Sequence, residues 1–272
     1  MISFPKAKIN LGLRVVEKRP DGFHDIETIF YPIALSDALE FVVLSGQSKE
    51  DELKITGIDI RTRPEKNLVI KAVRILRARY PVPRLKIHLH KAIPSGAGLG
   101  GGSSDAACIL KSINKCFRYS LSESELKVIA LELGSDCPFF LDPVPSIATG
   151  RGEILKPVSS LLKGYHIVLL NPGFLISTKE AYHNCRPVRP ETSLEQLVTT
   201  PLSGWKKLIV NDFEDFVFKV YPRVGELKKA LYRSGAVYCS MTGSGSTVYG
   251  IYEDKPKIAD KLKEFIIYEG IL

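Results

Sequence analysis

The sequence predicts an α+β protein made of two domains. The chain has 272 residues, enough for one large domain or two modest ones. Strand-like alternation and helix-like periodicity are interspersed along it without an internal repeat, which is typical of the α+β class. A new unit that opens with a strand begins near residue 164. We therefore expect an N-terminal domain over 1–160 and a C-terminal domain over 161–272.

The first strand is expected over residues 6–14, where apolar and polar side chains alternate. Its apolar side chains would face inward, whereas Lys8 and Asn10 would lie on a polar face. A turn follows at 19–22, because proline fixes φ and glycine accepts positive φ.

The remaining elements follow from the same two periodicities. Further strands are expected at 37–44, 53–57, 84–91, 145–156, from 164, at 236–241 and at 246–252. Helices are expected after Pro64, at 104–116, 122–133, 177–184, 211–220 and 223–233, and as a charged amphipathic helix at the end of the chain.

The formal net charge of +8 raises the question of a nucleic-acid partner. The densest basic stretch, 74–91, ends in a segment where basic residues alternate with Leu85, Ile87 and Leu89. Such alternation is typical of a strand with one solvated face. No aromatic residues interleave with these alternating charges, so stacking on single-stranded nucleic acid is not indicated. We expect no nucleic-acid partner, since diffuse positive charge also fits an anionic small molecule.

Targeting signals and metal-binding spacings are missing from the sequence. No apolar run is long enough to cross a bilayer, and the first residues lack a secretory or transit pattern. The five cysteines form no CxxC pair and no metal spacing with the histidines, as expected for free thiols in a reducing compartment. We therefore expect a cytoplasmic protein with no membrane partner and no structural zinc.

The strongest feature is a glycine-rich loop between a predicted strand and a predicted helix. It holds five glycines within residues 96–102, followed by Ser103 and Ser104. Glycines let backbone N–H groups approach an anion, and the helix that follows aims its positive dipole end at the same point. The two serines can donate hydroxyl groups to phosphate or bind magnesium. The predicted triphosphate site consists of Pro94, Ser95, Gly96, Ala97, Gly98, Leu99, Gly100, Gly101, Gly102, Ser103 and Ser104.

Other interpretations of this loop fit less well. A flexible linker is not expected, because Pro94 and an alanine-rich helix start bound the loop tightly. The Walker loop needs Gly-Lys followed by Ser or Thr, and no lysine is present here. A dinucleotide site needs a strand ending in Asp or Glu about 20 residues later, where helices are predicted instead. A second short loop, 241–246, is explained equally well as a hairpin turn or as a segment that closes the substrate end of a site.

Phosphoryl transfer to an alcohol requires a group that accepts or guides the hydroxyl proton and a cation that neutralises charge. Asp136 lies in a loop directly after a predicted helix, between Gly134 and Pro138. Lys8 lies on the first strand with apolar neighbours on both sides. A turn-capping aspartate and a solvated lysine are the alternatives, and both stay open at this point.

Three segments together resemble the GHMP kinases, the family of galactokinase, homoserine kinase and mevalonate kinase. These segments are 7–11, 94–107 and 241–245, and the resemblance spans essentially the whole chain in the family's order. A branch of the family that acts on a cytidine-diphosphate-linked polyol is similar in three further segments, 19–24, 100–102 and 134–139.

The resemblance implies the two-domain GHMP-kinase fold, with an N-terminal α/β domain that holds the phosphate loop and a ferredoxin-like C-terminal domain. It implies an ATP-dependent phosphotransferase with an alcohol acceptor, working with ATP and Mg²⁺ in non-mevalonate isoprenoid biosynthesis. Its partners would be small-molecule substrates, and we expect a monomer or a weak homodimer.

The resemblance also assigns roles to site residues. ATP would lie over residues 94–104, with Asn67 near the adenine. Asp136 would act as base or orienter on the acceptor hydroxyl, with Lys8 holding it ionised. The substrate contacts would be His24 on the cytosine edge, Phe23 and Tyr182 stacked on the ring, and Asn10 and Thr178 near the polyol or its phosphates.

This chain departs from the family pattern at three positions. The family usually has tyrosine at Phe23, asparagine at Asp105 and alanine at Ser135. A carboxylate at position 105 would repel the phosphates unless it caps the helix or meets magnesium, so the magnesium ligands stay open. Segment 184–210, which contains the only tryptophan, Trp205, has no assigned role.

Two alternative functions follow from the same features. Another GHMP kinase would share the phosphate loop but would have no reason to stack a cytosine. A non-enzymatic nucleotide-binding or nucleic-acid-binding module would show steeply salt-dependent binding and no turnover.

Overall fold

The computed structural model describes residues 1–45, 49–60 and 66–272, and Pro64 lies outside these ranges. The described residues form two compact units that are interleaved along the chain. The first unit comprises Met1–Ala7, Leu35–Ser95 and Gly100–Pro143, and the second comprises Lys8–Ala34, Gly96–Leu99 and Val144–Leu272. The expected division of the sequence into a domain over 1–160 and a domain over 161–272 stays a prediction.

The first unit contains a four-stranded sheet. Its order is β1 (Ile2–Ser3), β4 (Ala38–Val43), β6 (Leu85–Lys91) and β5 (Glu52–Gly57). Strand β6 pairs antiparallel with β4 and parallel with β5. Leu85, Ile87 and Leu89 are fully buried while Lys86 and His90 are exposed, so the predicted solvated face of this strand is confirmed.

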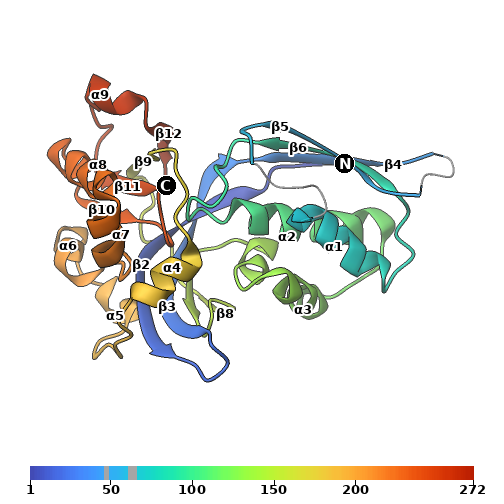
Figure 1. The fold of residues 1–272 in the computed structure, drawn as a ribbon, viewed down its shortest axis with the longest axis horizontal. Helices are drawn as coiled ribbons and strands as arrows, with labels where there is room; N and C mark the ends of the chain where they lie inside the picture. The colour runs from blue at the N-terminus through green and yellow to red at the C-terminus, as the bar shows by residue number, and fades with distance from the viewer. Residues whose placement is uncertain (46–48, 61–65) are drawn as a thin grey trace. The chain divides into compact units, whose positions relative to one another are not determined.

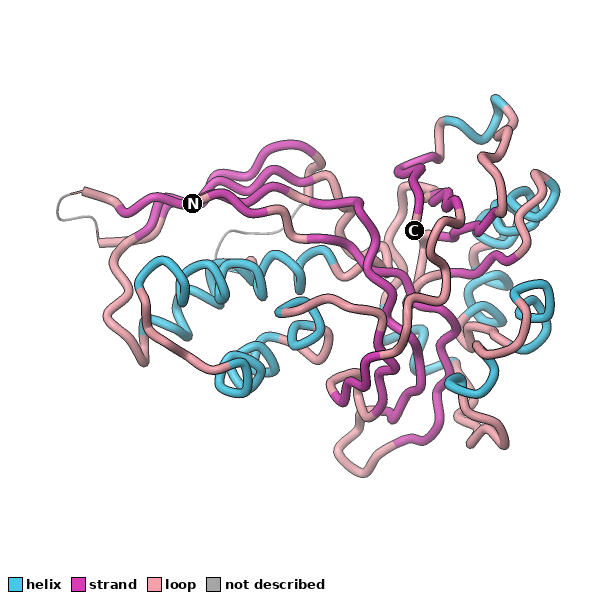
Figure 2. Tube along the Cα trace, turned by 180° about the vertical axis from the view of Figure 1, so that it is seen from behind, coloured by secondary structure: helices cyan, strands magenta, loops and turns pink. Residues whose placement is uncertain are grey.

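Helices cover one side of this sheet (Figures 1 and 2). They are α1 (Leu68–Arg77), α2 (Gly101–Phe117) and α3 (Glu123–Leu133), followed by the short 3₁₀ helix η2 (Cys137–Leu141). Helix α1 buries an apolar stripe that includes Val69, Val73 and Leu76, as the sequence periodicity predicted. Helix α3 begins at a capping box formed by Ser122 and Glu125.

The second unit contains most of a sheet with the order β2 (Lys6–Lys18), β3 (His24–Ser36), β7 (Ser146–Thr149) and β8 (Ile154–Pro157). Figure 1 shows β2 and β3 as long neighbouring strands in blue. The predicted turn between them is confirmed, with Arg19 N–H donating to Phe23 O at 2.8 Å. Strand β3 was not predicted. Most of its residues are buried on both faces, which removes the alternation by which a strand is recognised.

A second sheet in this unit is fully antiparallel. Its order is β10 (Tyr238–Met241), β11 (Val248–Tyr252), β9 (His166–Leu170) and β12 (Ile266–Ile271). Helices α7 (Glu214–Val220) and α8 (Pro222–Arg233) lie between β9 and β10 in the chain, and α9 (Asp260–Lys263) lies between β11 and β12. This β-α-β-β-α-β order is the expected ferredoxin-like arrangement. The predicted closing helix was wrong, because α9 spans only four residues and the chain ends in β12.

Segment 184–210, left without a role by the sequence, packs within the second unit. It follows α4 (Thr178–Asn184) and contains α5 (Leu194–Leu197), η3 (Leu202–Gly204) and α6 (Trp205–Leu208). Trp205 is buried, donates from Nε1 to Thr200 O at 3.0 Å and meets the Tyr238 ring edge-on. Across the described residues, no helix combines the length and apolar character that a bilayer span requires.

Candidate functional site

The glycine-rich loop has a backbone that side chains would obstruct. Gly96, Gly98 and Gly100 have φ values of 63°, 79° and 70°, a region that L-residues rarely adopt. A Cβ on Gly98 would lie 1.9 Å from the carbonyl oxygen of Thr242. Position 98 therefore requires glycine for both its conformation and its close approach to the second loop.

Helix α2 begins directly after this loop and presents an N-terminus suited to an anion. Its N-cap residue is Gly100, which has no side chain with which to satisfy the first N–H groups, and no acidic side chain lies in its first turn. Unpaired N–H groups and the positive end of the helix dipole favour phosphate at this position. The residues of the loop therefore fit a triphosphate group.

Helix α2 begins at Gly101, three residues before the predicted start at 104, so both serines of the loop lie in its first turn. Ser104 is buried, and its N–H donates to Gly100 O at 2.9 Å. Burial raises the pKa of the Cys137 thiol to about 11, although a hydrogen bond with Ser103 acts in the opposite direction. The bond to Cys137 places Ser103 beside the residue that follows Asp136, within the first unit.

Asp136 occupies the N-cap position of η2, directly after the end of α3. The turn is closed by a hydrogen bond from Cys137 N–H to Gly134 O at 3.1 Å. Asp136 is partly buried, and it belongs to the first unit, whereas Lys8 belongs to the second. A joint action of Asp136 and Lys8 stays a prediction.

Lys8 is buried on β2, with 3% of its surface exposed, so the alternative of a solvated lysine was wrong. Its Nζ donates to Asn10 Oδ1 at 2.6 Å and to Gly98 O at 3.2 Å. The ammonium also lies 4.9 Å from the centroid of the Phe30 ring. Lys8 thus contacts the phosphate loop directly. The expected polar face of this strand is thus buried at Lys8 and Asn10, and Asn10 bonds to both Thr28 and Thr242.

Asn10 and Thr242 join the first and third motifs. Thr242 Oγ1 lies 2.9 Å from Gly98 O and 3.1 Å from Asn10 Oδ1, and Asn10 Nδ2 donates to Thr28 Oγ1 at 2.9 Å. Asn211 stabilises loop 241–246, because its Nδ2 donates to the carbonyl oxygens of Met241 and Gly243. The sequence offered a hairpin turn or a substrate-closing role for loop 241–246. The sequence marked this loop as a motif but did not predict that Thr242 supports the phosphate loop.

Asn67 caps α1: its Oδ1 accepts from Val69 N–H at 2.9 Å, and the residue is 7% exposed. The start of α1 lies beside the start of α2, since a Cβ on Gly102 would be 3.7 Å from Leu68 Cδ1. This cap gives Asn67 a structural role that the sequence did not predict. Its contact with adenine stays a prediction.

The predicted cytosine-binding residues include a stacked pair. The rings of His24 and Tyr182 are 4.9 Å apart with an interplanar angle of 17°, and Phe213 meets Tyr182 edge-on. Burial lowers the pKa of His24, and the nearby charge of Lys18 lowers it further. His24 is therefore neutral near pH 7, with a donor and an acceptor nitrogen available for the edge of a base.

Phe23 and Thr178 contact other side chains of the second unit. Phe23 is 53% exposed, and the Arg151 guanidinium lies 5.0 Å from its ring centroid. Thr178 begins α4, and its hydroxyl lies 2.9 Å from that of Ser244 in the third motif. Ser244 belongs to a motif that the sequence showed, although its contact with Thr178 was not predicted, and the sequence carried no signal for Arg151.

Asp105 is the fifth residue of α2 and does not cap the helix. It is buried in α2, and its Oδ2 accepts from Lys91 Nζ at 2.7 Å. The expected repulsion between this carboxylate and the phosphates is therefore reduced by a paired ammonium. Within the described residues, no three His, Cys, Asp or Glu side chains gather in a way that could hold a metal ion.

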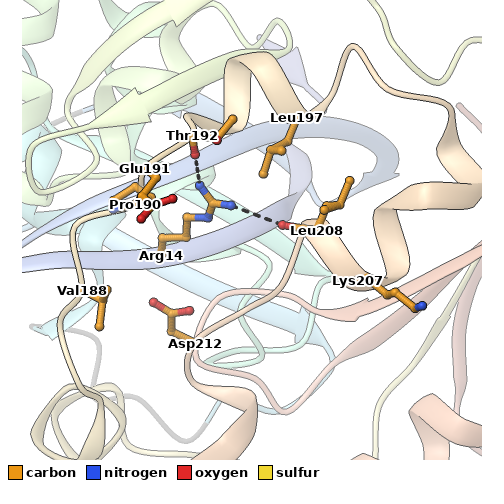
Figure 3. Close-up of a pocket in the computed structure, with 9 residues that line it drawn as sticks. All are labelled: Arg14, Val188, Pro190, Glu191, Thr192, Leu197, Lys207, Leu208 and Asp212. Atoms are coloured by element: carbon orange, nitrogen blue, oxygen red, sulfur yellow. Dashed lines mark hydrogen bonds between the residues drawn. The ribbon is translucent and has the colours of Figure 1, made fainter.

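A pocket of about 390 Å³ in the second unit lies beside segment 184–210 (Figure 3). Arg14 reaches across it, donating to Thr192 O at 2.6 Å and to Leu208 O at 3.2 Å. Asp212, at its edge, accepts from Val15 N–H, and burial raises the pKa of its carboxyl group. None of the predicted site residues lines this pocket. Arg14 therefore serves to fasten segment 184–210 to β2.

Two family models match the sequence of this chain. The N-terminal domain of GHMP kinases matches residues 67–142, and the C-terminal domain of GHMP kinases matches residues 193–267. A curated relative from Bacteroides thetaiotaomicron, named 4-diphosphocytidyl-2-C-methyl-D-erythritol kinase, is 50% identical over 93% of this chain and 92% of its own length. A relative of the same name from Parabacteroides distasonis is 48% identical over 100% of both chains.

Solved structures agree with these relatives. A crystal structure of 4-(cytidine 5'-diphospho)-2C-methyl-D-erythritol kinase superposes with a TM-score of 0.77 at 32% identity, covering 92% of this chain and 90% of that one. Homoserine kinase from Cytophaga hutchinsonii has a TM-score of 0.63 at 17% identity, over 96% of this chain and 87% of that one, and shows the fold alone. The chain therefore belongs to the GHMP kinases, in the family of the 4-diphosphocytidyl-2-C-methyl-D-erythritol kinases.

Proposed function

We propose that this protein is a kinase that transfers the γ-phosphoryl group of ATP to the 2-hydroxyl of 4-diphosphocytidyl-2-C-methyl-D-erythritol. The reaction belongs to non-mevalonate isoprenoid precursor biosynthesis. The observation that carries the proposal is the phosphate loop, where three glycines with positive φ lead into a helix capped by Gly100. The full-length likeness to relatives with this name supports the choice of acceptor.

ATP would bind with its phosphates over residues 94–104 and its adenine near Asn67. The start of α2 supplies N–H groups and the positive end of a dipole to the phosphates. Lys8 adds an ammonium group that is already fixed against Gly98 O. Mg²⁺ would accompany ATP and neutralise the charge that develops on the transferred group.

The acceptor hydroxyl would be activated by Asp136 as base or orienter. Its oxygen attacks the γ-phosphorus, the bond to the β–γ bridging oxygen breaks, ADP leaves, and the hydroxyl proton passes to Asp136. Lys8 would keep Asp136 ionised and stabilise negative charge on the transferred group. Both assignments rest on the motif resemblance, together with the burial of Lys8 and the partial burial of Asp136.

The cytidylyl group would be recognised by the aromatic residues of the second unit. His24 would bond to the edge of the cytosine, and Phe23 and Tyr182 would stack on its faces; stacking contributes roughly 1–3 kcal/mol per base. Asn10 and Thr178 would lie near the polyol or its phosphates. The stacked pair of His24 and Tyr182 supports this assignment, because it already gathers two of these rings.

We expect a cytoplasmic protein whose partners are small molecules, and its five free thiols suit a reducing compartment. We expect a monomer or a weak homodimer, which sedimentation velocity over a range of protein concentrations tests directly.

The decisive experiment is coupled ADP release with magnesium-ATP and three alcohols: 4-diphosphocytidyl-2-C-methyl-D-erythritol, mevalonate and homoserine. Turnover with the cytidylyl substrate alone, abolished by chelating Mg²⁺, supports the proposal. Turnover only with another alcohol would support ATP binding by the phosphate loop but would contradict the assignment of a cytosine-binding site. No turnover with any of the three, together with salt-dependent binding of polynucleotide, would favour a non-enzymatic binding module.

A further inference from the structure

A buried charge cluster lies next to the phosphate loop, entirely within the first unit. Lys91, the last residue of β6, is 3% exposed, and its Nζ contacts Oδ2 of both Asp37 and Asp105. Asp37 is 1% exposed and Asp105 is 2% exposed. None of these three residues has a part in the catalytic steps described above.

The first arm of this cluster holds the backbone that enters the loop. Asp37 Oδ1 accepts from the N–H groups of Ala92 at 2.6 Å and Ile93 at 2.8 Å. These are the two residues directly before Pro94. Charge-assisted hydrogen bonds of this kind are stronger than neutral ones, so the path into the loop is fixed by the Asp37 carboxylate.

The second arm holds the helix that leaves the loop. Asp105 is the fifth residue of α2, and its bond to Lys91 joins the second turn of the helix to the end of β6. The Lys91 ammonium also lies close beneath the first residue of α2, because a Cβ on Gly101 would be 3.3 Å from Nζ. One lysine thereby connects the two ends of the loop that would hold ATP.

This arrangement is costly as a stabilising device. Two buried carboxylates share one ammonium, and Asp105 Oδ1 is buried with no hydrogen-bond partner among the described residues. Replacing buried ionic clusters by apolar groups is often neutral or stabilising, so cohesion alone is a weak reason for such a cluster. Its geometry instead sets where the loop begins and where the helix begins.

We propose that Lys91 is a positioning residue for ATP, tying the entry of the phosphate loop through Asp37 to the start of α2 through Asp105. The inference rests on the proposed function, since it concerns the same nucleotide. Lys91 touches no substrate in this account. It acts by holding the N–H groups of the loop in the arrangement that the triphosphate requires. A displacement of about 1 Å in such a site strongly reduces activity.

Two variants of Asp105 separate the effect of its hydrogen bond with Lys91 from the effect of its negative charge. Asp105→Asn and Asp105→Leu both remove the carboxylate charge near the phosphates, but only Asn keeps an oxygen that can accept from Lys91. We expect Asp105→Leu to raise the KM for ATP, and the Kd for a non-hydrolysable ATP analogue measured by calorimetry, about tenfold relative to Asp105→Asn. The KM for the alcohol is expected to be the same in both variants.

A merely structural role makes a different prediction. Loss of folded protein lowers the active fraction and the apparent kcat but leaves both KM values and the Kd of the folded fraction unchanged. Arg77→Met is the matched control, because Arg77 pairs with buried Asp51 at the other end of β6. It is expected to lower thermal stability without changing the Kd for the analogue.

Two outcomes would overturn the inference: equal analogue affinity in Asp105→Asn and Asp105→Leu, or an equal loss of affinity in Arg77→Met. If Asp105→Leu does not fold, Asp105→Ala severs the same tie without added bulk and answers the same question. Measurements on the wild-type protein distinguish failure of the proposed function from failure of the positioning role of Lys91. Failure of wild type to bind the analogue or to release ADP counts against the proposed function, whereas normal wild type with indistinguishable variants counts only against the positioning role.

Discussion

The two units each bury a lysine against the phosphate loop, but they surround it differently. In the first unit Lys91 is held by the carboxylates of Asp37 and Asp105. In the second unit Lys8 bonds to a side-chain amide oxygen and a backbone carbonyl and lies over an aromatic ring. Carboxylates bind an ammonium and neutralise it, whereas neutral dipoles orient it without removing its charge. The difference assigns an anchoring role to Lys91 and fits the proposed catalytic role of Lys8.

The largest expected effect tests the proposed catalytic roles of Lys8 and Asp136. Lys8→Met and Asp136→Asn should each reduce kcat by about 10²–10⁴-fold, the size of a lost acid–base or charge-stabilising group. Because we propose that the two act together, the double variant should be little worse than either single one. Steady-state kinetics with calorimetry of the ATP analogue measure this, and affinity for the analogue should change little in Asp136→Asn. Near-normal turnover in Asp136→Asn would remove that residue from the catalytic role.

The second effect tests the anchoring side. Lys91→Met leaves two buried carboxylates without their cation and should lower the free energy of unfolding by about 3–5 kcal/mol. Lys8→Met leaves neutral acceptors, so its cost should be nearer 1–3 kcal/mol. Urea denaturation of the two variants compares them directly. Equal losses would show that the neutral and charged surroundings are energetically alike, and the contrast would fail.

A third effect concerns the place where Lys8 meets the loop. Gly98→Ala forces a side chain at φ 79° to within 1.9 Å of Thr242 O, and it should weaken binding of the ATP analogue at least tenfold. Gly204→Ala is the control, since its new Cβ would have no neighbour nearer than 3.9 Å and its φ is negative. Wild-type affinity in Gly98→Ala would mean that the backbone relaxes at this position without loss.

The smallest expected effect concerns the protonation of His24, a residue of the second unit. The pKa of His24 lies below its ordinary value of 6.5 through burial and the charge of Lys18, so His24 is neutral at pH 7 and becomes charged as the pH falls. The KM for the cytidylyl substrate should be flat near neutrality and rise about threefold to tenfold on acidification, the size of one hydrogen bond.

Lys18→Ala provides the check on this pH dependence. Removing the lysine relieves the repulsion, so the pKa of His24 should rise and the increase in KM should begin at a higher pH. An unchanged profile would assign the pH effect to another group.

Much of the fold was predictable because its segments obey simple periodicities. The alternation in β6 and the apolar stripe of α1 each have one buried and one exposed face, so both were found. Strand β3 was missed because burial on both faces leaves no alternation. The prediction of a helix in the final segment was wrong, because the Ile266 to Ile271 stretch is rich in residues that favour strands and pairs with β9.

The site was predictable where a motif concentrates its chemistry in a few neighbouring residues. The phosphate loop is of this kind, since glycines, serines and a helix start follow one another. The supporting contacts are not local: Asp37 and Lys91 are 54 residues apart, and Asn10 and Thr242 are 232 residues apart. The sequence showed an unusual carboxylate at Asp105 but not the lysine that pairs with it, because only folding brings the two together.

The interleaving of the two units limits how this protein can be divided. The chain passes from one unit to the other after residues 7, 34, 95, 99 and 143, so neither unit is a continuous stretch of sequence. A fragment covering 161–272 would lack Val15, whose backbone pairs with Val188 and with the Asp212 carboxylate. A fragment ending at residue 160 would carry the phosphate loop but not Thr242, which lies against it. Genetic fusions and insertions are therefore better placed at exposed turns that hold no proposed site residue, such as the one at Gly235, than at a single cut between the two halves of the chain.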